Sequence, residues 1–490
     1  MGDNIKSKMI GTLAWTSIDR FGQQAVQFVI AIALARLLSP SEYTLIALVM
    51  IFITLANTLV DGGFGNALVR KQDATELDFN TVFYFNIAVS VFLYLVLFFI
   101  APLIASFYNE PELTLVARVV FIAILFNAFY LIPNVKLAKA LNFKKSAFVN
   151  ISAVSLSGIV GVAIALKGYG VWALVSQQLA FPFFRALIAH FQIDWKPRLM
   201  FSFTVIKEFF SYSINLLGTS ILNTIFLYIY VLIVGKFFPK QEVGFYYQAN
   251  KLNESVNFSL QVILGNTYHV FVKIQEDTER LRRVFRELIR HSSILILPML
   301  MLLIAVADPF INTLLSAKWA HSIPYFQLLC LASLFNPMYA ITISALNARG
   351  KSKATFIIEI FKKVITVLSI IVLLKYGILW LLVGFTLANW ISTLVSVVVL
   401  KNELKHFWRH QLADVLPSLL IGLVLGAVVY LWLQVNWYKH YILMAQLISG
   451  VVVYLISVRV VYPTLFKQVA SGVWSKLNSW KNKLSTTKNF

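Results

Sequence analysis

About fourteen apolar segments divide the chain, and each is long enough to cross a bilayer as a helix. The polar connections between the segments are too short to fold as separate domains. The apolar segments cover residues 12–36, 44–67, 80–104, 113–134, 146–166, 171–192, 209–235, 246–271, 289–313, 323–346, 356–374, 378–400, 416–434 and 441–463. The sequence therefore predicts an all-α polytopic membrane protein.

The composition agrees with this class and decides how the positive charge is interpreted. Hydrophobic residues make up 59% of the chain and charged residues 13%, with a mean hydropathy of +0.77. A net charge of +21 would suit a nucleic-acid-binding protein, but positively charged cytoplasmic loops account for it in a membrane protein. We therefore expect no nucleic-acid partner. The first apolar segment is too long for a cleavable signal peptide and is expected to remain as a helix.

Lysine and arginine are distributed unevenly between the two sides of the predicted helices. With the N-terminus inside, the cytoplasmic segments hold about 30 of these residues and the external loops about 7. Because membrane proteins retain positive loops on the cytoplasmic side, this asymmetry predicts the orientation. With an even number of spans, both termini are expected in the cytoplasm.

Four short motifs recur in the second half of the chain, each about 200 residues after its first copy. The pairs are Pro40–Tyr43 with Pro239–Tyr246, Gln72–Glu76 with Gln275–Glu279, Ala101–Ile104 with Asp308–Ile311, and Lys167–Trp172 with Lys375–Trp380. The repeat predicts two lobes of six helices with the same orientation. We place these lobes at 1–200 and 201–410, followed by an extra helix pair at 411–465. Residues 466–490 are expected to form a cytoplasmic amphipathic tail.

Polar side chains form a stripe along several of the predicted helices. Residues three or four apart share one helix face. The stripes comprise Thr12, Thr16, Arg20, Gln23 and Gln27 in the first segment; Thr54, Asn57, Asp61 and Gly65 in the second; Asn215, Thr219, Asn223 and Tyr230 in the seventh; and Asn250, Glu254, Asn257 and Gln261 in the eighth, beside Lys251. These helices correspond in pairs under the repeat, which favours a shared pathway. The alternative is that polar side chains bind helices to one another.

Charged residues inside the apolar segments are the second indication of a pathway. A charge at mid-bilayer costs about 2.5–3.5 kcal/mol, so it is expected to face protein or a wet cavity. The cations are Arg20, Arg118, Arg185 and Lys251, and the acids include Asp19, Asp61 and Glu254. Asp19 is expected to neutralise Arg20 in part, and Glu254 to neutralise Lys251. Buried ion pairs are the structural alternative, and Arg118 and Arg185 also suit packing or snorkelling.

Five stretches carry a resemblance to a known family. They are Leu34–Tyr43, Gly63–Lys71, Pro102–Leu113, Gly168–Val175 and Val243–Leu252. Together they resemble the polysaccharide transporters, the Wzx-type (WzxC/TuaB-like) lipid-linked oligosaccharide flippases of the multidrug/oligosaccharidyl-lipid/polysaccharide exporter superfamily. The similarity extends from residue 1 to about residue 430. Thr44 stands where this family usually has glycine.

The resemblance implies two six-helix lobes, alternating access, and a central cavity lined by the first, second, seventh and eighth helices. It also implies that the C-terminal helix pair holds a lipid tail, that no cofactor is needed, and that the protein lies in a bacterial cytoplasmic (inner) membrane. The substrate would be a polyprenyl-diphosphate-linked oligosaccharide, such as an O-antigen, capsule or exopolysaccharide unit. Membrane lipids and other polysaccharide assembly proteins are the further partners that it suggests.

The chemistry of such a substrate selects the candidate binding residues. A diphosphate needs cations, which arginine supplies as a planar fork and lysine as a point charge. Amide, carboxylate and hydroxyl groups bind sugar hydroxyls. The candidate substrate-binding residues are Arg20, Lys251, Gln23, Gln27, Asn57, Asp61, Asn215, Asn223, Glu254, Asn257, Arg185 and Arg118. Arg20 and Lys251 are favoured for the diphosphate, as a clamp between the two halves.

Two other function classes remain open at this point. A drug or small-cation exporter of the same superfamily would be expected to carry acid-rich cavity faces. A membrane polysaccharide polymerase or ligase would need a large external loop, and the predicted external connections are short, so we expect no enzyme. The seven histidines lack ligand spacing, so no metal site is expected. The basic stretch Glu279–Arg290 is interpreted as a surface helix at the membrane, and Gly422 and Gly426 as a close-packing motif.

Overall fold

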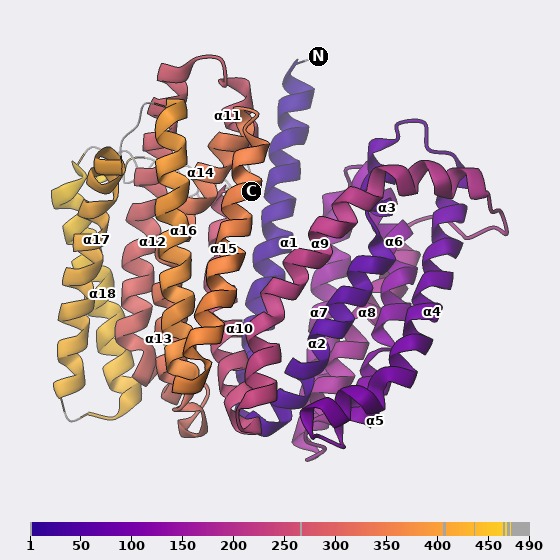
Figure 1. Cartoon of the computed structure of the whole chain (residues 1–490), viewed down its shortest axis with the longest axis horizontal. Helices are drawn as coiled ribbons and strands as arrows, with labels where there is room; N and C mark the ends of the chain where they lie inside the picture. The colour runs from indigo at the N-terminus through magenta and orange to yellow at the C-terminus, as the bar shows by residue number, and fades with distance from the viewer. Residues whose placement is uncertain are drawn as a thin grey trace, which may run out of the picture. The chain divides into compact units, whose positions relative to one another are not determined.

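The computed structural model describes residues 2–264, 267–404, 408–435, 437–463, 466–467 and 471, and within these ranges it contains helices and no strand (Figure 1). The first half comprises α1 (Gly2–Leu37), α2 (Pro40–Asp61), α3 (Phe64–Arg70), α4 (Glu76–Tyr108), α5 (Leu113–Val120), α6 (Ala123–Lys139), α7 (Phe143–Leu166), α8 (Trp172–Gln192) and α9 (Phe203–Phe237). The second half comprises α10 (Lys240–Leu264), α11 (Thr267–Lys273), α12 (Thr278–Leu314), η1 (Ala317–Trp319), α13 (Ser322–Ser333), α14 (Asn336–Ala348), α15 (Ser352–Leu373), η2 (Leu374–Tyr376), α16 (Ile378–Leu404), α17 (Trp408–Leu431), η3 (Trp432–Gln434) and α18 (Lys439–Val461).

Within the described residues, ten helices are long and apolar enough to cross a membrane. They coincide with ten of the predicted spans. The other four predicted spans also lie on helices, namely α1, α8, α10 with α11, and α15, but these are not among the ten. The prediction of an all-α, multi-pass membrane protein is confirmed.

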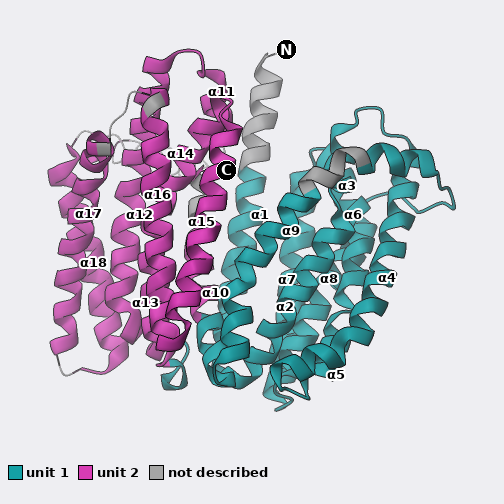
Figure 2. Cartoon of the chain, in the orientation of Figure 1, with its two compact units in different colours: residues 1–248, 314–319 teal, residues 249–313, 320–490 magenta. Residues whose placement is uncertain are grey.

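The chain divides into two compact units, which are coloured separately in Figure 2. Unit 1 contains Met1–Gln248 and Leu314–Trp319, and unit 2 contains Ala249–Thr313 and Ala320–Phe490. The division falls inside α10. Helix α9 packs on α2, α3 and α4 of unit 1. The lobes inferred from the repeat, with their boundary near residue 200, stay a prediction, because the repeat divides the chain by internal similarity and not by compactness.

A double glycine separates α2 from α3 and ends the polar stripe of α2. Gly62 and Gly63 adopt φ angles of 50° and 79°, in the left-handed region that glycine reaches without steric cost. The helix therefore stops directly after Asp61, and the chain turns back into α3. This turn leaves Asp61 at a helix end, where its carboxylate stays exposed.

Two copies of one repeated motif meet in unit 1, around the fully buried Trp319. The indole Nε1 donates to the Ala35 carbonyl at 2.8 Å. Tyr43 and Phe245, one from each copy of the motif, place their rings edge-on to the indole at centroid distances of 5.2 and 6.2 Å. Thr44 donates from Oγ1 to the Lys240 carbonyl at 2.6 Å. The threonine that departs from the family pattern therefore binds α2 to the start of α10.

The same contact brings Gly244 against the backbone of Pro40, where a Cβ atom would overlap the Pro40 carbonyl. We expect Gly244→Ala to destabilise the protein by about 1–3 kcal/mol, the usual range for overpacking. Gly218→Ala is the matched control, because a Cβ there meets nothing within 4 Å. The control should be neutral or stabilise α9 by up to about 1 kcal/mol through helix propensity. Unfolding temperatures of the purified variants in detergent measure both effects, and equal temperatures would contradict the close approach.

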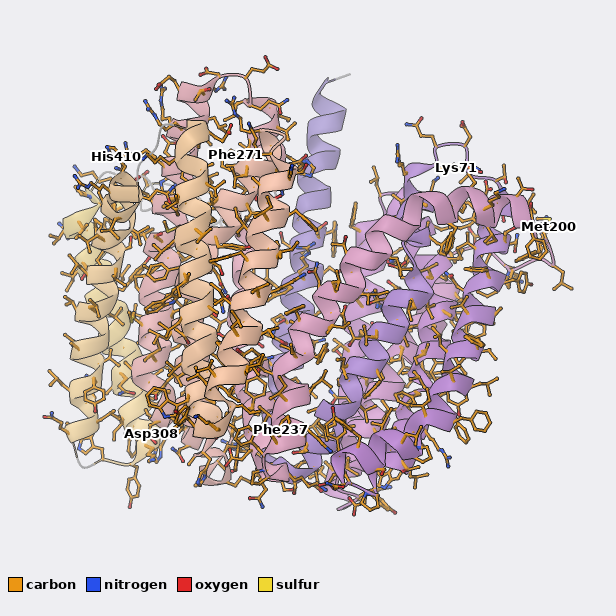
Figure 3. All side chains as sticks on the ribbon, viewed as in Figure 1. Lys71, Met200, Phe237, Phe271, Asp308 and His410 are labelled. Atoms are coloured by element: carbon orange, nitrogen blue, oxygen red, sulfur yellow. The ribbon has the colours of Figure 1, made fainter. Side chains whose placement is uncertain are left out.

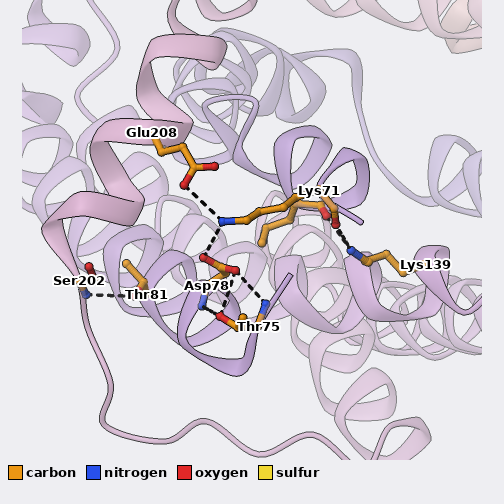
Figure 4. Close-up of polar contacts among 8 residues, drawn as sticks. Lys71, Thr75, Asp78, Thr81, Lys139, Ser202 and Glu208 are labelled. Atoms are coloured by element: carbon orange, nitrogen blue, oxygen red, sulfur yellow. Dashed lines mark hydrogen bonds and ion pairs between the residues drawn. The ribbon is translucent and has the colours of Figure 1, made fainter. Parts of the chain in front are cut away.

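A cluster of polar contacts fixes the start of α4, as Figure 4 shows. Asp78 closes a capping box by accepting from the Thr75 backbone at 2.8 Å, and its carboxylate also pairs with Lys71 at 3.2 Å. Lys71 contacts Glu208 of α9 at 3.3 Å. Burial alone would lower the pKa of Lys71, but the hydrogen bonds and charges of Asp78 and Glu208 raise it overall. Lys71 therefore stays charged at neutral pH and links the first turns of α9 to α4.

The C-terminal helices α17 and α18 pack beside α12 within unit 2 (Figure 1). A Cβ on Gly422 would lie 3.0 Å from the Met301 side chain, which confirms the predicted close packing at this glycine. On α18, Tyr454 donates to the Ile294 carbonyl at 3.3 Å. Most of the predicted amphipathic tail, 466–490, lies outside the described residues. Whether this helix pair holds a lipid tail stays a prediction.

The basic stretch Glu279–Arg290 differs from its sequence interpretation. It is not a separate surface helix but the first turns of α12, which continues to Leu314. Its apolar residues Leu281 and Phe285 are fully buried, and Phe285 packs on Phe271. The amphipathic pattern is present, and it arises because one face of α12 enters the core of unit 2.

Candidate functional site

A polar cavity of about 570 Å³ lies inside unit 1. It is lined by α2, α3, α6, α8 and α9 and is open on one side. Its polar lining consists of Thr54, Asn57, Thr58, Asp61, Asn66, Asn127, Tyr130, Asn134, Arg185 and Ser220. Amides and hydroxyls dominate this set, while Arg185 brings a positive charge and Asp61 a negative one. Such a lining, among helices that cross a membrane, offers many hydrogen-bond donors and acceptors to a polar ligand.

Two polar stripes build most of the cavity wall. Thr54, Asn57 and Asp61 come from the stripe that the sequence predicts on α2, and the structure brings them together. The facing stripe on α6 includes Asn127, whose Nδ2 donates to Asn57 Oδ1 at 3.1 Å. The amide pair holds α2 and α6 together. At this point the polar side chains therefore both line the cavity and bind two helices to each other.

Arg185 on α8 is held in place by two neighbours. Its Nε donates to Asn150 Oδ1 on α7 at 2.9 Å. Its guanidinium carbon lies 3.8 Å from the centre of the Tyr130 ring, a cation–π contact. Tyr130 in turn donates from its hydroxyl to Asn134 Oδ1 at 2.9 Å. The guanidinium is thus oriented by side chains of α6 and α7 at the wall of the cavity.

The negative charge nearest to this chain of contacts is Asp19 on α1. Asn150 donates from Nδ2 to Asp19 Oδ2 at 3.2 Å, so one amide joins the carboxylate to Arg185. Gln23 also donates to Asp19, at 2.7 Å. The described residues show no ion pair between Asp19 and Arg20, because adjacent residues on a helix point about 100° apart and do not face each other. Partial neutralisation of Arg20 by Asp19 stays a prediction.

Four other predicted residues of unit 1, Arg20, Gln27, Arg118 and Asn223, are not among the residues that line the cavity. Arg20 and Gln27 are exposed on α1, and Arg20 has no hydrogen bond or ion pair within the described part of the chain. Arg118 donates to the Phe98 carbonyl at 3.2 Å and lies over the Phe98 ring, which fits the packing alternative. Asn223 is exposed on α9. The side chain of Asn215 lies outside the described residues.

The predicted residues of unit 2 lie along α10. Glu254 accepts from Asn250 at 2.7 Å, and the described residues show no ion pair between it and the half-buried Lys251. Asn257 donates to Ser333 Oγ at 3.0 Å and accepts from Asn336, so it binds α10 to α13 and α14. This favours the alternative in which Asn257 joins neighbouring helices and does not bind substrate. The clamp of Arg20 with Lys251 stays a prediction.

Several cavity residues were missed at the sequence level although they carried a detectable signal. Asn127, Tyr130 and Asn134 are spaced by three and four in the fourth apolar segment, which is one more polar helix face. Asn150 is not among the lining residues but orients Arg185; it is a lone intramembrane amide, and nothing in the pattern singles it out. Its role depends on a tertiary contact. Among the described residues, no group of three His, Cys, Asp or Glu side chains is arranged to hold a metal ion.

The fold is shared with solved membrane transporters. The lipid II flippase MurJ in an inward closed conformation superposes with a TM-score of 0.72, covering 93% of this chain and 99% of that chain at 17% identity. An inward-facing multidrug resistance transporter of the MATE family gives a TM-score of 0.63 and covers 78% of this chain and 94% of that chain at 15% identity. The helical arrangement and the polar cavity thus define a polytopic membrane protein with the MurJ- and MATE-like transporter fold.

Sequence comparison places the chain more narrowly. The model of a family described as polysaccharide biosynthesis protein matches residues 33–324, and the chain belongs to this family. The succinoglycan biosynthesis transport protein ExoT of Rhizobium meliloti is 24% identical, covering 85% of this chain and 91% of the relative. The lipopolysaccharide biosynthesis protein WzxC of Escherichia coli is 25% identical, covering 87% and 89%. The family resemblance read from the sequence is confirmed.

Proposed function

We propose that the protein is a flippase that moves a polyprenyl-diphosphate-linked oligosaccharide from the inner to the outer leaflet of a bacterial cytoplasmic membrane by alternating access. Its membership of the polysaccharide biosynthesis family supports the substrate class, and its fold supports transport. The relatives named for transport and for polysaccharide assembly suggest the same role. On this proposal the protein is a transporter and not an enzyme.

The observation that carries the proposal is the cavity of unit 1, with Arg185 beside uncharged amides and hydroxyls. A guanidinium binds phosphate oxygens through paired N–H donors. Asn57, Asn127 and Asn134 can both donate to and accept from sugar hydroxyls, and Asp61 can accept from them. This lining therefore matches a substrate with an anionic phosphate end and a neutral, hydroxyl-rich end.

The membrane potential contributes to the direction of transport in this proposal. An inside-negative potential favours outward movement of an anion by about 2.3 kcal/mol per charge per 100 mV. No nucleotide hydrolysis is needed for this contribution. Membrane lipids surround the protein, and other polysaccharide assembly proteins would supply and consume the substrate.

Deleting the gene in its own host tests the proposal. We expect a defined surface polysaccharide to disappear and its lipid-linked repeat unit to accumulate inside the cell. Restoring the gene should restore the polysaccharide. An unchanged set of surface glycans, combined with a new sensitivity to cationic drugs, would instead support the drug-exporter alternative.

The proposed orientation, with both termini cytoplasmic, has its own test. In a Cys330→Ser background, single cysteines at Asn109 and Ser316 should react with a membrane-impermeant thiol reagent in intact cells. A cysteine at Ser352 should react only after the membrane is opened, because the Lys/Arg distribution places it inside. Labelling of the Ser352 position in intact cells would contradict the orientation.

A further inference from the structure

A buried carboxylate binds two arginines at the end of unit 2 where α12 begins. The Asp414 side chain on α17 has an exposed fraction of 0%, and it accepts from Arg286 Nε at 2.8 Å and Arg286 Nη2 at 2.9 Å. It also accepts from Arg290 Nε at 2.7 Å. Both arginine side chains remain partly open, with exposed fractions of 36% and 46%. The cluster is therefore closed on the carboxylate side and open on the guanidinium side.

The charge of this cluster is unbalanced. Two guanidinium groups share one carboxylate, which leaves one positive charge. Each guanidinium has five N–H donors, so donors remain beyond those that Asp414 accepts. The first turns of α12 hold five arginines and two glutamates, which makes the surroundings basic as well. Of these acids, Glu279 pairs with Arg282, while Glu287 is exposed between Arg286 and Arg290.

The cluster lies where two membrane helices reach the bilayer surface. The apolar part of α12 begins at Ile294, one turn after Arg290, and α17 becomes apolar after Asp414. Both helices are candidate spans. Figure 3 labels His410, one turn before Asp414, at this end of unit 2 and Asp308 at the opposite end. Arginines at this depth stand at the level of lipid headgroups.

A second observation on α17 is a buried amide without a hydrogen bond, close to Asp414 in the sequence. Gln411 is fully buried, and neither atom of its amide has a hydrogen-bond partner within the described residues. It precedes Asp414 by three residues, so the two side chains lie on the same helix face. Leaving a buried amide unbonded costs about 1–3 kcal/mol in a typical protein.

We propose that Arg286, Arg290 and Asp414 form a binding site for the phosphate group of an anionic membrane lipid. One guanidinium can bind a phosphate through two parallel N–H···O bonds. Asp414 occupies the Nε–Nη2 edges of Arg286 and Arg290, which fixes both groups and leaves their outer N–H donors for a ligand. Partial burial protects the interaction from screening by salt. The site lies on unit 2 and is independent of the transported substrate, so it goes beyond the proposed transport function.

Purified protein in detergent, titrated with phosphatidylglycerol or with phosphatidylcholine, tests the site. The unfolding temperature should rise more with phosphatidylglycerol in the wild type, and native mass spectrometry should show the bound lipid. Arg290→Gln should weaken phosphatidylglycerol binding about fivefold, the effect of one basic residue near a lipid surface. This variant leaves the two bonds from Arg286 to Asp414, so the helix contact remains.

Arg282→Gln is the matched control, because it removes the same charge from the same part of α12 but has Glu279 as its partner. It should bind phosphatidylglycerol like the wild type. Arg290→Lys keeps the positive charge but lacks the planar guanidinium. Its affinity for phosphatidylglycerol should lie between those of Arg290→Gln and the wild type. Equal lipid dependence in Arg290→Gln and the wild type, or an equal loss in Arg282→Gln, would overturn the proposal. If inorganic phosphate raises the unfolding temperature as much as phosphatidylglycerol does at the same concentration, the site binds a soluble anion, and the lipid assignment is overturned.

Discussion

Replacing Arg185 with glutamine is expected to reduce transport about 10- to 100-fold while the protein still reaches the membrane. Glutamine can keep the hydrogen bond to Asn150, but it loses the charge that would bind a phosphate. Hydrogen bonds to charged groups contribute about 1.5–3 kcal/mol, which corresponds to that range. Arg185→Lys should restore transport only in part, because lysine lacks the planar fork. Surface polysaccharide, divided by protein abundance in the membrane, measures the effect.

Arg118→Gln is the matched control for Arg185→Gln. Arg118 is also an arginine within an apolar segment, but it packs on Phe98 and does not line the cavity. Its loss should change abundance slightly and transport per molecule hardly at all. Equal transport by Arg185→Gln and the wild type, at equal abundance, would remove Arg185 from the proposed site.

Trp319→Ala is expected to have the largest effect on stability, about 3–5 kcal/mol, the usual cost of emptying a buried tryptophan site. The substitution removes the bond to the Ala35 carbonyl and the ring contacts to Tyr43 and Phe245. Because these contacts join the starts of α2 and α10, their loss should loosen unit 1 where the two repeated motifs meet. The yield and unfolding temperature of the purified protein measure the loss.

The control for this substitution is Trp380→Ala on α16, because the Trp380 side chain is 54% exposed. It removes the same side chain but empties no packed site. We expect its unfolding temperature to stay close to that of the wild type. Similar losses for the two variants would show that tryptophan content, and not the contact at Trp319, determines stability.

The helices were predictable because the bilayer imposes a length and an apolar composition on each span. The stripe of α2 up to Asp61 was predictable in the same way, since a helix face is a local feature of the sequence. The break at Gly62–Gly63 was not predicted, because the apolar composition continues through it to residue 67, and Gly65 therefore lies on α3. The course of α12 was harder to predict. Its basic first turns have the pattern of a surface helix, and only the burial of Leu281 and Phe285 shows that they enter the core.

The candidate site was predictable only in part. Asn57, Asp61 and Arg185 were named from their positions in apolar segments, and all three line the cavity. The partner of Asp19 could not be found in the sequence, because Asn150 is 131 residues away and reaches it through the packing of α7 on α1. Polar groups in membranes find partners on neighbouring helices, and a single sequence does not show which helices are neighbours.

Reconstitution into liposomes tests the central claim most directly. The lipid-linked oligosaccharide that accumulates in the deletion strain would be placed in the inner leaflet, and its appearance on the outside would be followed with a glycan-cleaving enzyme that cannot cross the membrane. The account predicts that the wild type moves this lipid outward much faster than protein-free liposomes, and that Arg185→Gln remains close to the protein-free rate. Folded wild-type protein that gives no more movement than protein-free liposomes would contradict the account.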